Sequence, residues 1–561
     1  MSTSSSECLW DRWARWAEQR PDADAIVHMV AGEATQRWTW KSLVHAALGF
    51  ATVLKAAGVQ PGQVCALVIR HHPQFYPLYL GISALGAIPS VLAYPNARIH
   101  PDKFVHGLAG MARRSGLDWI ATERSLEPVV RPLVESKDTS VRGLLFPLDG
   151  VSTSGAATRP FQPDPSAPCL LQHSSGTTGL QKAVVLSHRS VLEHVHAYAT
   201  ALDLKTSDKI ASWLPLYHDM GMIAAFHLPL AFGIPLIQLD PFEWVTAPML
   251  LLDAISREGA TLTWLPNFAY NLLADRVHEE ELEGIRLDTM RLFVNCSEPV
   301  RAESHRKFLE RYQPRGVRPD SLAACYAMAE TTFAATQTPL GAQARTVFLD
   351  RDALSRGQVA LVPEGDNARA CVSSGHPIPG CEIRVEGEAD ETLPDGSVGE
   401  LLIRSATMFD GYRNYPDETA RVLRDGWYHS GDYGFALDGE YYVIGRKKDI
   451  IIVAGKNLYP EDIEDEVGRV PGIIPGRVIA FGLEDETAGT EQVCIVAESE
   501  ATAVADQRNL RLDVQRAAMA IDVTVAKVYL APPRWLIKSS AGKPSRKANR
   551  QRIFDGELAP V

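Results

Sequence analysis

The sequence predicts an α/β fold divided into at least two domains. With 561 residues and an apolar fraction of 46%, the chain is too long to bury its apolar side chains in one core. Helical patterns alternate with short β-branched runs, which is typical of layered α/β structure. After residue 380 the pattern changes to strands and tight turns. We therefore expect a large N-terminal domain of layered α/β subdomains with a β-rich subdomain, and a small α+β domain at the C-terminus.

The first elements are a helix, a buried strand and a second helix. Trp13 and Trp16 fall on one face of a helix that Pro21-Asp22 ends, so we interpret these tryptophans as core anchors. The β-branched run at residues 64–69 predicts a buried strand, and the apolar residues 79–87 predict the helix that follows it.

The region after residue 380 contains short strands and hairpin turns. Residues 381–385 and 401–404 predict strands. Asp425-Gly426 and Asp438-Gly439 are typical of tight hairpin turns. We expect an antiparallel, β-rich layer here.

Composition excludes several classes of protein. The formal net charge of −12 gives no general reason to expect binding to nucleic acid or to an anionic membrane. The cysteines are scattered and form no C-x-x-C pair, so we expect reduced, mostly buried thiols in a cytoplasmic protein and no zinc site.

No segment resembles a secretion signal or a membrane span. The N-terminus lacks an apolar core of the kind that signal peptides have, and no stretch reaches about 18 uninterrupted apolar residues. The most apolar segment, residues 223–239, is interrupted by His227, Pro229, Gly233 and Pro235. We expect that segment to pack in the core, and we expect no integral membrane association.

Glycine and hydroxyl residues gather in one short run closed by a lysine, at residues 174–182. Glycine lets the backbone approach an anion closely, while N–H groups, hydroxyls and lysine neutralise its charge. Residues 167–172 and 182–187 predict strands on both sides, so the run joins a hairpin; a P-loop NTPase would need a helix there and a Lys-Ser/Thr pair. We predict a phosphate-binding loop, with a flexible surface loop as the alternative. Its candidate residues are Ser174, Ser175, Gly176, Thr177, Thr178, Gly179 and Lys182.

Further segments downstream match one enzyme superfamily in its expected order. They are Trp213-Leu-Pro-Leu-Tyr-His-Asp-Met-Gly221, Tyr326-Ala-Met-Ala-Glu-Thr331, Gly399-Glu-Leu-Leu-Ile-Arg404, Tyr428-His-Ser-Gly-Asp432, Gly445-Arg-Lys-Lys-Asp449 and Gly542-Lys543. Together with residues 174–182, they make the sequence resemble the acyl- and aryl-adenylate-forming enzymes across most of its length.

The resemblance implies activation of a carboxylate by ATP. A carboxylate is a poor acyl donor, so it first attacks the α-phosphate of ATP in line and pyrophosphate leaves; the enzyme supplies positioning and charge stabilisation. In this family residues 174–182 would hold the β- and γ-phosphates, and Glu330 would bind Mg²⁺, which takes its other ligands from water and phosphate. The alternative for Glu330 is a solvated charge at a helix start.

The same resemblance implies a set of nucleotide-binding residues. Asp432 would accept hydrogen bonds from both ribose hydroxyls, and Arg446 would contact ribose or phosphate. A loop at residues 297–299 would pack on adenine, with Tyr326 stacked on the base. His218 would line the site near the acid, because no third metal ligand at helical spacing and no nucleophile elbow accompany His218-Asp219. The nucleotide-binding candidates are Ser297, Glu298, Pro299, Tyr326, Ala327, Met328, Ala329, Thr331, Asp432 and Arg446.

Two lysines are implied to serve the motion of the C-terminal domain. Lys543 matches a lysine that reaches the carboxylate and the α-phosphate during adenylation and is then withdrawn. Lys448 matches the hinge, where a few backbone torsions would let a mobile C-terminal domain turn. We therefore expect domains at residues 1–446 and 447–561, with the hinge between strands at 441–444 and 450–453. A solvated basic tail is the alternative for Lys543, and the nearby basic residues suggest contact with an acidic partner.

The segment between the acidic motif and Gly375 favours one subfamily. An insertion at about residues 340–372, together with Pro266-Asn-Phe-Ala-Tyr270, resembles the fatty acyl-AMP ligases. In that subfamily the insertion accompanies failure to use coenzyme A, so the acyl group passes to the phosphopantetheine thiol of a separate acyl carrier protein. A structureless surface loop is the alternative for the insertion.

Three other functions share part of this pattern. An acyl-CoA synthetase would have the same catalytic residues and a different acceptor. A non-catalytic nucleotide-binding module is disfavoured because Lys182, Glu330, Asp432, Arg446 and Lys543 are all present. A phosphotransferase would release ADP rather than AMP and pyrophosphate.

Overall fold

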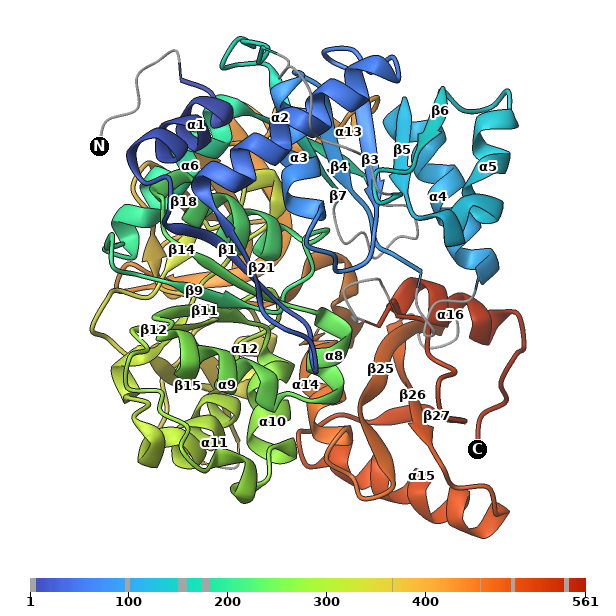
Figure 1. The fold of residues 1–561 in the computed structure, drawn as a ribbon. Coiled ribbons are helices and arrows are strands. Elements are labelled where there is room, and N and C mark those ends of the chain that lie inside the picture. Colours follow the sequence, from blue (N-terminus) through green and yellow to red (C-terminus); the bar gives the residue numbers. More distant parts are fainter. Residues whose placement is uncertain are drawn as a thin grey trace.

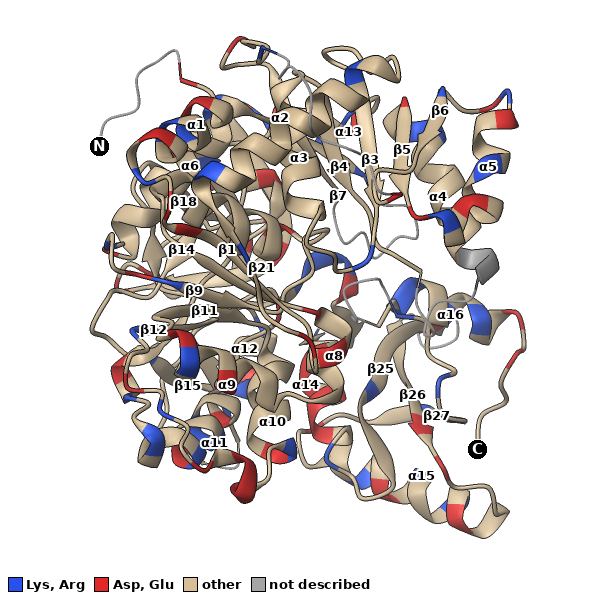
Figure 2. Ribbon diagram, viewed as in Figure 1, with Lys and Arg blue, Asp and Glu red and all other residues tan. Residues whose placement is uncertain are grey.

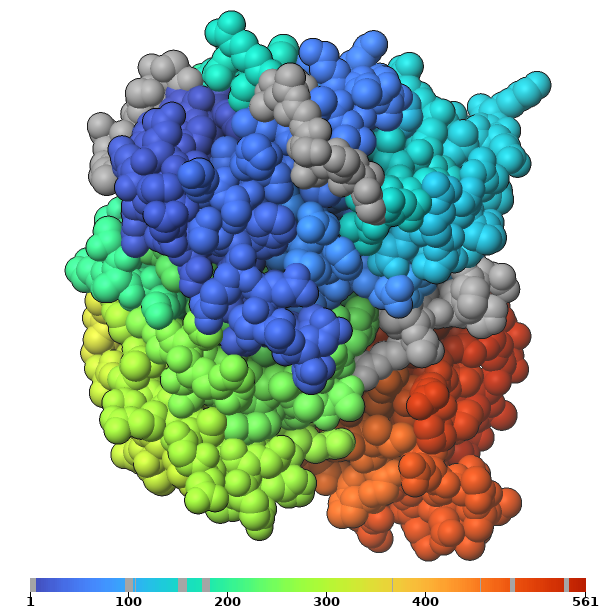
Figure 3. Space-filling model, in the orientation of Figure 1, coloured from blue at the N-terminus to red at the C-terminus, as the bar shows by residue number. Residues whose placement is uncertain are grey.

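The computed structural model describes residues 7–95, 101–149, 159–173, 182–365, 367–454, 456–485, 490–538 and 544–561. Figure 1 shows two α/β layers and a β-rich layer in the N-terminal part, and a smaller group of C-terminal elements beside them. In Figure 3 the C-terminal residues form one lobe against the rest of the molecule. This architecture confirms the predicted α/β class.

The first large sheet has six strands and carries the hairpin that leads to residues 174–182. Its strands are parallel except for the final antiparallel pair. In spatial order they are β6 (Gly143–Leu145), β5 (Trp119–Thr122), β3 (Val64–Val68), β4 (Ile88–Val91), β7 (Pro168–His173) and β8 (Ala183–Ser187). The predicted hairpin around the glycine-rich run is thus confirmed, while residues 174–181 lie outside the described ranges.

The second large sheet has seven strands, parallel except at the edge pair β1–β2. In spatial order they are β13 (Leu322–Ala324), β12 (Leu292–Asn295), β11 (Leu262–Leu265), β9 (Ile210–Ser212), β10 (Leu236–Leu239), β1 (Asp24–Met29) and β2 (Gln36–Thr39). Because parallel strands end at the same edge, the loops after β9, β12 and β13 meet there.

Helices cover both sheets, and most of them share one large core with the strands. Those of the N-terminal part are α1 (Leu9–Gln19), α2 (Trp40–Ala56), α3 (Phe75–Ala84), α4 (Pro101–Ser115), α5 (Glu127–Glu135), α6 (His188–Ala201), η2 (Met220–His227, a π-helix), α7 (Leu228–Phe232), α8 (Pro241–Thr246), α9 (Met249–Glu258), α10 (Asn267–Arg276) and α11 (Ala302–Tyr312). Trp13 is completely buried in α1, which confirms its predicted role as a core anchor, and residues 223–239 are core as predicted.

Helix α3 differs from its prediction by beginning and ending earlier. The sequence pattern predicts a helix at residues 79–87, whereas α3 covers Phe75–Ala84. Gly86 has a φ of +71°, so the chain leaves the helix there, although the apolar pattern continues to Ile88.

The β-rich layer is an antiparallel sheet of five strands. Its strands are β18 (Cys381–Glu386), β19 (Gly399–Ser405), β20 (Leu423–Arg424), β21 (Trp427–Leu437) and β22 (Glu440–Arg446), with α13 (Pro416–Val422) beside them. Asp425-Gly426 and Asp438-Gly439 form the turns into β21 and β22 with positive φ at both residues, as predicted for tight hairpins.

The inserted segment has regular structure. It contains β15 (Thr346–Asp350), α12 (Arg351–Ser355) and β16 (Ala368–Val372), and β15 pairs with β16. Leu349 and Leu354 are buried in a cluster that also includes Tyr442 and Tyr459. The described part of this segment is therefore a packed hairpin and helix, which contradicts the alternative of a structureless loop.

The C-terminal elements surround a separate three-stranded sheet. They are β23 (Ile451–Val453), β24 (Lys456–Leu458), α14 (Pro460–Val467), β25 (Ile473–Asp485), β26 (Thr490–Ser499), α15 (Val504–Met519), β27 (Val525–Ala531) and α16 (Arg546–Phe554). A hydrophobic core of their own extends from Ile451 to Leu530. The turn η7 (Lys447–Asp449) connects them to β22.

The cysteines and the helices can be compared with two expectations from the sequence. All eight cysteines lie in the described ranges as free thiols, and seven are buried. Among the described helices, none combines the length and apolarity that a membrane span requires.

Candidate active site

The candidate site lies at the carboxyl edge of the seven-stranded sheet. The loop after β9 carries His218, the loop after β12 carries Ser297, and the loop after β13 carries Tyr326 and Glu330. Open parallel sheets bind ligands at this edge, because the loops converge there. The fold thus brings together segments that are far apart in the sequence.

Glu330 is a buried carboxylate with one specific partner. It lies in the turn η6 (Ala329–Thr331) and is 8% exposed. Burial raises the pKa of Glu330, and the Tyr412 hydroxyl, which donates a hydrogen bond of 2.7 Å to Oε1, opposes that rise. The alternative of a solvated helix-start charge is therefore wrong.

Tyr412 connects Glu330 to the end of the glycine-rich hairpin. Residues 410–413 run along β8 through backbone hydrogen bonds, which fixes Tyr412 beside Lys182. The Lys182 Nζ lies 4.7 Å from the centroid of the Tyr412 ring and 2.7 Å from Oε2 of Glu418. Hydrogen bonds from Arg421 and Lys182 lower the pKa of Glu418 to about 2. A phosphate placed at Lys182 would compete with Glu418 for this cation.

Asp432 and Arg446 form an ion pair on adjacent strands. They are cross-strand partners on β21 and β22, and the Arg446 Nε lies 2.7 Å from Asp432 Oδ1. The Tyr326 hydroxyl donates to the other oxygen, Oδ2, at 2.5 Å. Asp432 raises the pKa of Arg446, so the guanidinium stays charged. Asp432 therefore contacts two other candidates for nucleotide binding, Arg446 and Tyr326, through its two carboxylate oxygens.

His218 and Ser297 both contact Met220. The His218 Nδ1 lies 2.7 Å from Asp219 Oδ1 and accepts a hydrogen bond from Met220 N at 3.3 Å. Ser297 has a φ of +69°, and its hydroxyl contacts the Met220 sulfur at 3.7 Å. Non-glycine residues with positive φ are uncommon and gather at functional sites. The predicted adenine loop and acid-site segment are thus neighbours.

The remaining predicted residues have less direct geometry. The Glu298 carboxylate is engaged within the protein, where it accepts a hydrogen bond from Phe268 N at 3.0 Å. Pro299 follows in the same loop, and Ala327, Met328, Ala329 and Thr331 surround Glu330 in the chain. Lys448 lies in the exposed turn η7, where partial desolvation of its ammonium group lowers its pKa. Ser174, Ser175, Gly176, Thr177, Thr178, Gly179 and Lys543 lie outside the described ranges.

Several residues of this neighbourhood were not predicted from the sequence. Tyr412 and Glu418 contact Glu330 and Lys182 from segments 82 and 236 residues away. No local pattern marks such partners. The described residues hold no cluster of three or more potential metal ligands. Glu330 is therefore not part of such a cluster.

Asn549 in α16 holds both ends of the segment that contains Lys543. Its side chain is fully buried; Oδ1 accepts from Ile537 N at 2.7 Å, and Nδ2 donates to the carbonyls of Ile537 and Ser545 at 2.9 and 2.8 Å. Ser545 N also donates to the Ile537 carbonyl at 3.0 Å. Residues 537 and 545 are therefore fixed side by side at the base of the lysine segment.

Given the role that the resemblance implies for Lys543, we expect Asn549→Ala to slow adenylation because it releases this base. A misplacement of about 1 Å in a catalytic group is enough to lower the rate by roughly 10-fold to 10²-fold. Pyrophosphate exchange at saturating ATP would measure the loss. Gln551→Ala, which removes a solvent-exposed side chain on the same helix, should leave the rate unchanged. Equal rates for the two variants would contradict the positioning role.

The basic residues after Lys543 are largely engaged within the protein. Arg546 contacts Asp449, Glu461 and Glu464 at 2.7–2.9 Å. Arg552 pairs with Glu557 and stacks on Trp535. Figure 2 shows acidic residues along α14 and basic residues along α16. The alternative of a solvated basic tail is wrong for Arg546 and Arg552.

Three comparisons relate this arrangement to known proteins. A family model described as AMP-binding enzyme matches residues 13–413. A putative acyl-CoA synthetase from Caulobacter vibrioides is 30% identical over 535 residues, covering 94% of this chain and 92% of that protein. The long-chain-fatty-acid–AMP ligase FadD32 of Mycolicibacterium smegmatis is 28% identical, covering 97% of this chain and 94% of that protein. A structure of fatty acyl-adenylate ligase from L. pneumophila with acyl adenylate and pyrophosphate has a TM-score of 0.75 and 25% identity, covering 99% of this chain and 97% of that one.

Fold and family together define an adenylate-forming ligase. The chain belongs to the family of AMP-binding enzymes. The predicted resemblance to fatty acyl-AMP ligases is confirmed by the matched relatives and structures. This assignment contradicts the alternatives of a phosphotransferase and of a non-catalytic nucleotide-binding module.

Proposed function

We propose that the protein joins a fatty acid to AMP and then transfers the acyl group to the thiol of a separate acyl carrier protein, in the cytoplasm. The observation that carries the first half is that Tyr326, from the same loop as Glu330, contacts Asp432, which also pairs with Arg446. Such an arrangement offers a buried carboxylate for a phosphate-bound cation and an acceptor for ribose hydroxyls. The transferred acid would be placed by the loop that carries His218.

In this proposal each residue has one task in the adenylation step. Lys182 and residues 174–179 neutralise the β- and γ-phosphates. Asp432 accepts hydrogen bonds from the ribose hydroxyls, and Tyr326 stacks on the base. Residues 297–299 and 327–331 enclose the nucleotide, and Arg446 contacts ribose or phosphate. Lys543 stabilises charge at the α-phosphate while pyrophosphate leaves.

Glu330 suits Mg²⁺ by its chemistry. Mg²⁺ prefers hard oxygen ligands and is usually held by one or two carboxylates together with substrate phosphates. Glu330 supplies one carboxylate, buried and oriented by Tyr412. When bound, the ion would neutralise charge on the phosphate oxygens.

We also propose a domain boundary at the turn η7, with units at residues 1–446 and 447–561 and a hinge at Lys448. Separate hydrophobic cores on the two sides support it. The inserted hairpin packs against β22 and against Tyr459, which directly precedes α14. A segment that contacts both sides of a hinge can influence how the C-terminal unit turns. Such an influence on the orientation that receives the acceptor thiol supports an acceptor other than coenzyme A.

An acyl-CoA synthetase is the second candidate. It is favoured by one observation, the 30% identity to a protein that is named as a putative acyl-CoA synthetase. The two candidates share the adenylation step and differ only in the acceptor thiol.

Product identification would distinguish them. We expect incubation with Mg-ATP, a series of fatty acids and free coenzyme A to give acyl-AMP without acyl-CoA, and addition of a carrier protein bearing phosphopantetheine to give the acylated carrier. Mass spectrometry measures all three products. Efficient formation of acyl-CoA would favour the second candidate, and absence of AMP with every acid would contradict the adenylation proposal itself.

A further inference from the structure

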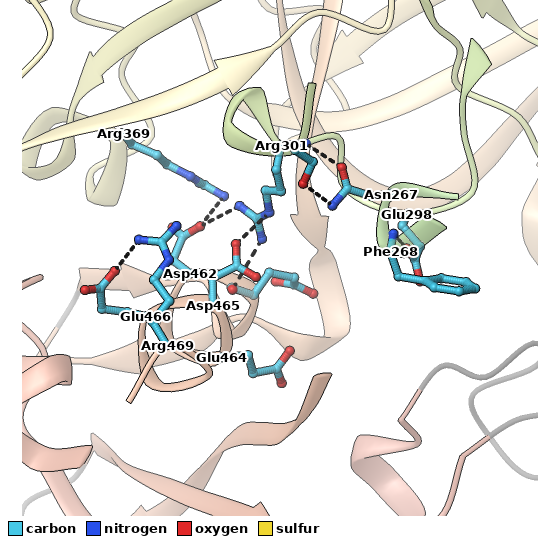
Figure 4. A network of polar contacts seen from close by, with 12 residues as sticks. Asn267, Phe268, Glu298, Arg301, Arg369, Asp462, Glu464, Asp465, Glu466 and Arg469 are labelled. Carbon is cyan, nitrogen blue, oxygen red and sulfur yellow. Dashed lines mark hydrogen bonds and ion pairs between the residues drawn. The ribbon is translucent and has the colours of Figure 1, made fainter. Parts of the chain in front are cut away.

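Helix α14 carries carboxylates on two sides, and each side contacts a different part of the molecule. Asp462 and Asp465 are three positions apart and therefore share one face, as do Glu461 and Glu464. Figure 4 shows Asp462 and Asp465 directed toward Arg301 and Arg369, while Glu464 points away from them. The helix thus contacts Arg301 and Arg369 on one side and Arg546 on another.

Arg301 joins the proposed adenine loop to α14. Its Nε lies 2.7 Å from Asp465 Oδ2, Nη2 donates to the Glu461 carbonyl at 3.3 Å, and Nη1 lies 3.7 Å from Asp462 Oδ1. Arg301 is only two residues beyond Pro299. A shift of α14 would therefore pull on the end of this loop.

The loop itself is held at both ends by one side chain. Asn267 Oδ1 accepts from Arg301 N at 3.0 Å and from Asn295 Nδ2 at 3.1 Å. In between, Ser297 has its positive φ and Glu298 accepts from Phe268 N. Since few torsions remain free, the position of Arg301 limits the positions available to Ser297.

Arg369 strengthens the same contact from the inserted hairpin. It is 6% exposed, and its Nη2 lies 2.8 Å from Asp462 Oδ1 and donates to the Ile444 carbonyl at 3.0 Å. Its guanidinium also lies 4.8 Å from the centroid of the Tyr459 ring. A buried cation that depends on Asp462 favours the present position of α14.

The neighbouring face of α14 holds the segment that follows Lys543. Arg546 contacts Glu461 at 2.9 Å, Glu464 at 2.7 Å and Asp449 of η7 at 2.8 Å. Only three positions separate Lys543 from Arg546. One short helix therefore connects the adenine loop with the base of the lysine segment and with the turn at the hinge.

We infer that Arg301 is a positioning residue, and that its ion pairs with Asp465 and Asp462 couple nucleotide binding to the orientation of the C-terminal unit. This inference rests on the proposed nucleotide role of residues 297–299. Two sites linked through one two-state element affect each other reciprocally. A nucleotide in the loop should stabilise the clamped orientation, and loss of the clamp should weaken nucleotide binding.

A charge reversal across the pair tests the inference. Arg301→Asp and Asp465→Arg, each alone, should weaken AMP binding measured by calorimetry by about fivefold or more, the lower end of typical coupling between sites. Each should also speed cleavage at Lys447-Lys448 by endoproteinase Lys-C, and AMP should no longer protect that turn. The double variant Arg301→Asp/Asp465→Arg should restore both properties. Asp462 is left unchanged, because its loss would strand the buried Arg369 and endanger folding.

Arg306→Asp provides the matched control. Arg306 lies on α11, the helix whose N-cap is Arg301, and its ion pairs within the described residues are with exposed Glu303 and Glu310. Its reversal should therefore change neither property. If the wild-type protein binds AMP and Arg301→Asp binds it with the same affinity, the proposed coupling is overturned. Failure of the folded double variant to recover would overturn it as well. If the wild-type protein bound no AMP, the proposed nucleotide site would be wrong and the coupling would fall with it.

Discussion

Replacing Glu330 by glutamine is expected to lower Mg²⁺-dependent acyl-AMP formation by about 10²-fold or more, the usual effect of removing a transition-state charge contact. Glutamine keeps the shape of the side chain and an oxygen for the Tyr412 hydroxyl, but it removes the negative charge. Pyrophosphate exchange over a range of Mg²⁺ concentrations measures the effect. A rate and Mg²⁺ dependence like those of the wild type would contradict the assignment.

The stability of the same variant distinguishes catalysis from structure. Burial raises the pKa of Glu330, so folding favours its neutral form and ionisation at pH 7 lowers the free energy of unfolding. Glutamine mimics the neutral form. We therefore expect the Glu330→Gln protein to unfold at the same temperature as the wild type or a higher one. An active-site carboxylate commonly has this cost in stability.

Two companion variants complete this experiment. Tyr412→Phe removes the hydroxyl that lowers the pKa of Glu330, so the acid limb of the rate profile should move to higher pH, with a smaller loss at alkaline pH. Glu310→Gln makes the same chemical change at an exposed helical position and should leave rate and profile unchanged. A shift of the acid limb to lower pH in Tyr412→Phe would contradict the proposed electrostatics.

Local features of this protein were predictable because local residues determine them. Asp425-Gly426 and Asp438-Gly439 favour positive φ at two successive positions, and both pairs adopt it. Apolar runs on both sides of the glycine-rich segment gave the β7–β8 hairpin. Pro460 opens α14 because proline is tolerated in the first turn of a helix.

Partners of charged side chains were not predictable in the same way. Arg301 finds Asp465 across 164 positions of sequence, and Lys182 finds Glu418 across 236. These pairs exist only after the sheets and helices have packed, so no periodicity or motif indicates them. The sequence also suggested a basic surface after Lys543, whereas Arg546 is enclosed by three carboxylates.

Lys543→Ala is expected to reduce adenylation by about 10²-fold or more while sparing transfer of the acyl group from added acyl-AMP. In the proposed mechanism Lys543 supplies positive charge only while pyrophosphate leaves. In the same proposal, transfer to a thiol follows after the C-terminal unit has turned about Lys448 and presents another face to the site. The two half-reactions should therefore separate, which a variant that is merely misfolded would not show.

Both rates can be measured on one preparation, as pyrophosphate exchange and as acylation of a carrier thiol from purified acyl-AMP. Lys538→Ala removes a lysine at the other end of the same segment, where its Nζ donates to the Gly476 carbonyl, and should leave exchange within about twofold of wild type, since exposed contacts of this kind contribute little. Near-native exchange in Lys543→Ala would exclude the assignment. An equal loss of both half-reactions would instead assign Lys543 a role throughout the cycle, and it would contradict the proposal that the C-terminal unit turns Lys543 away before transfer.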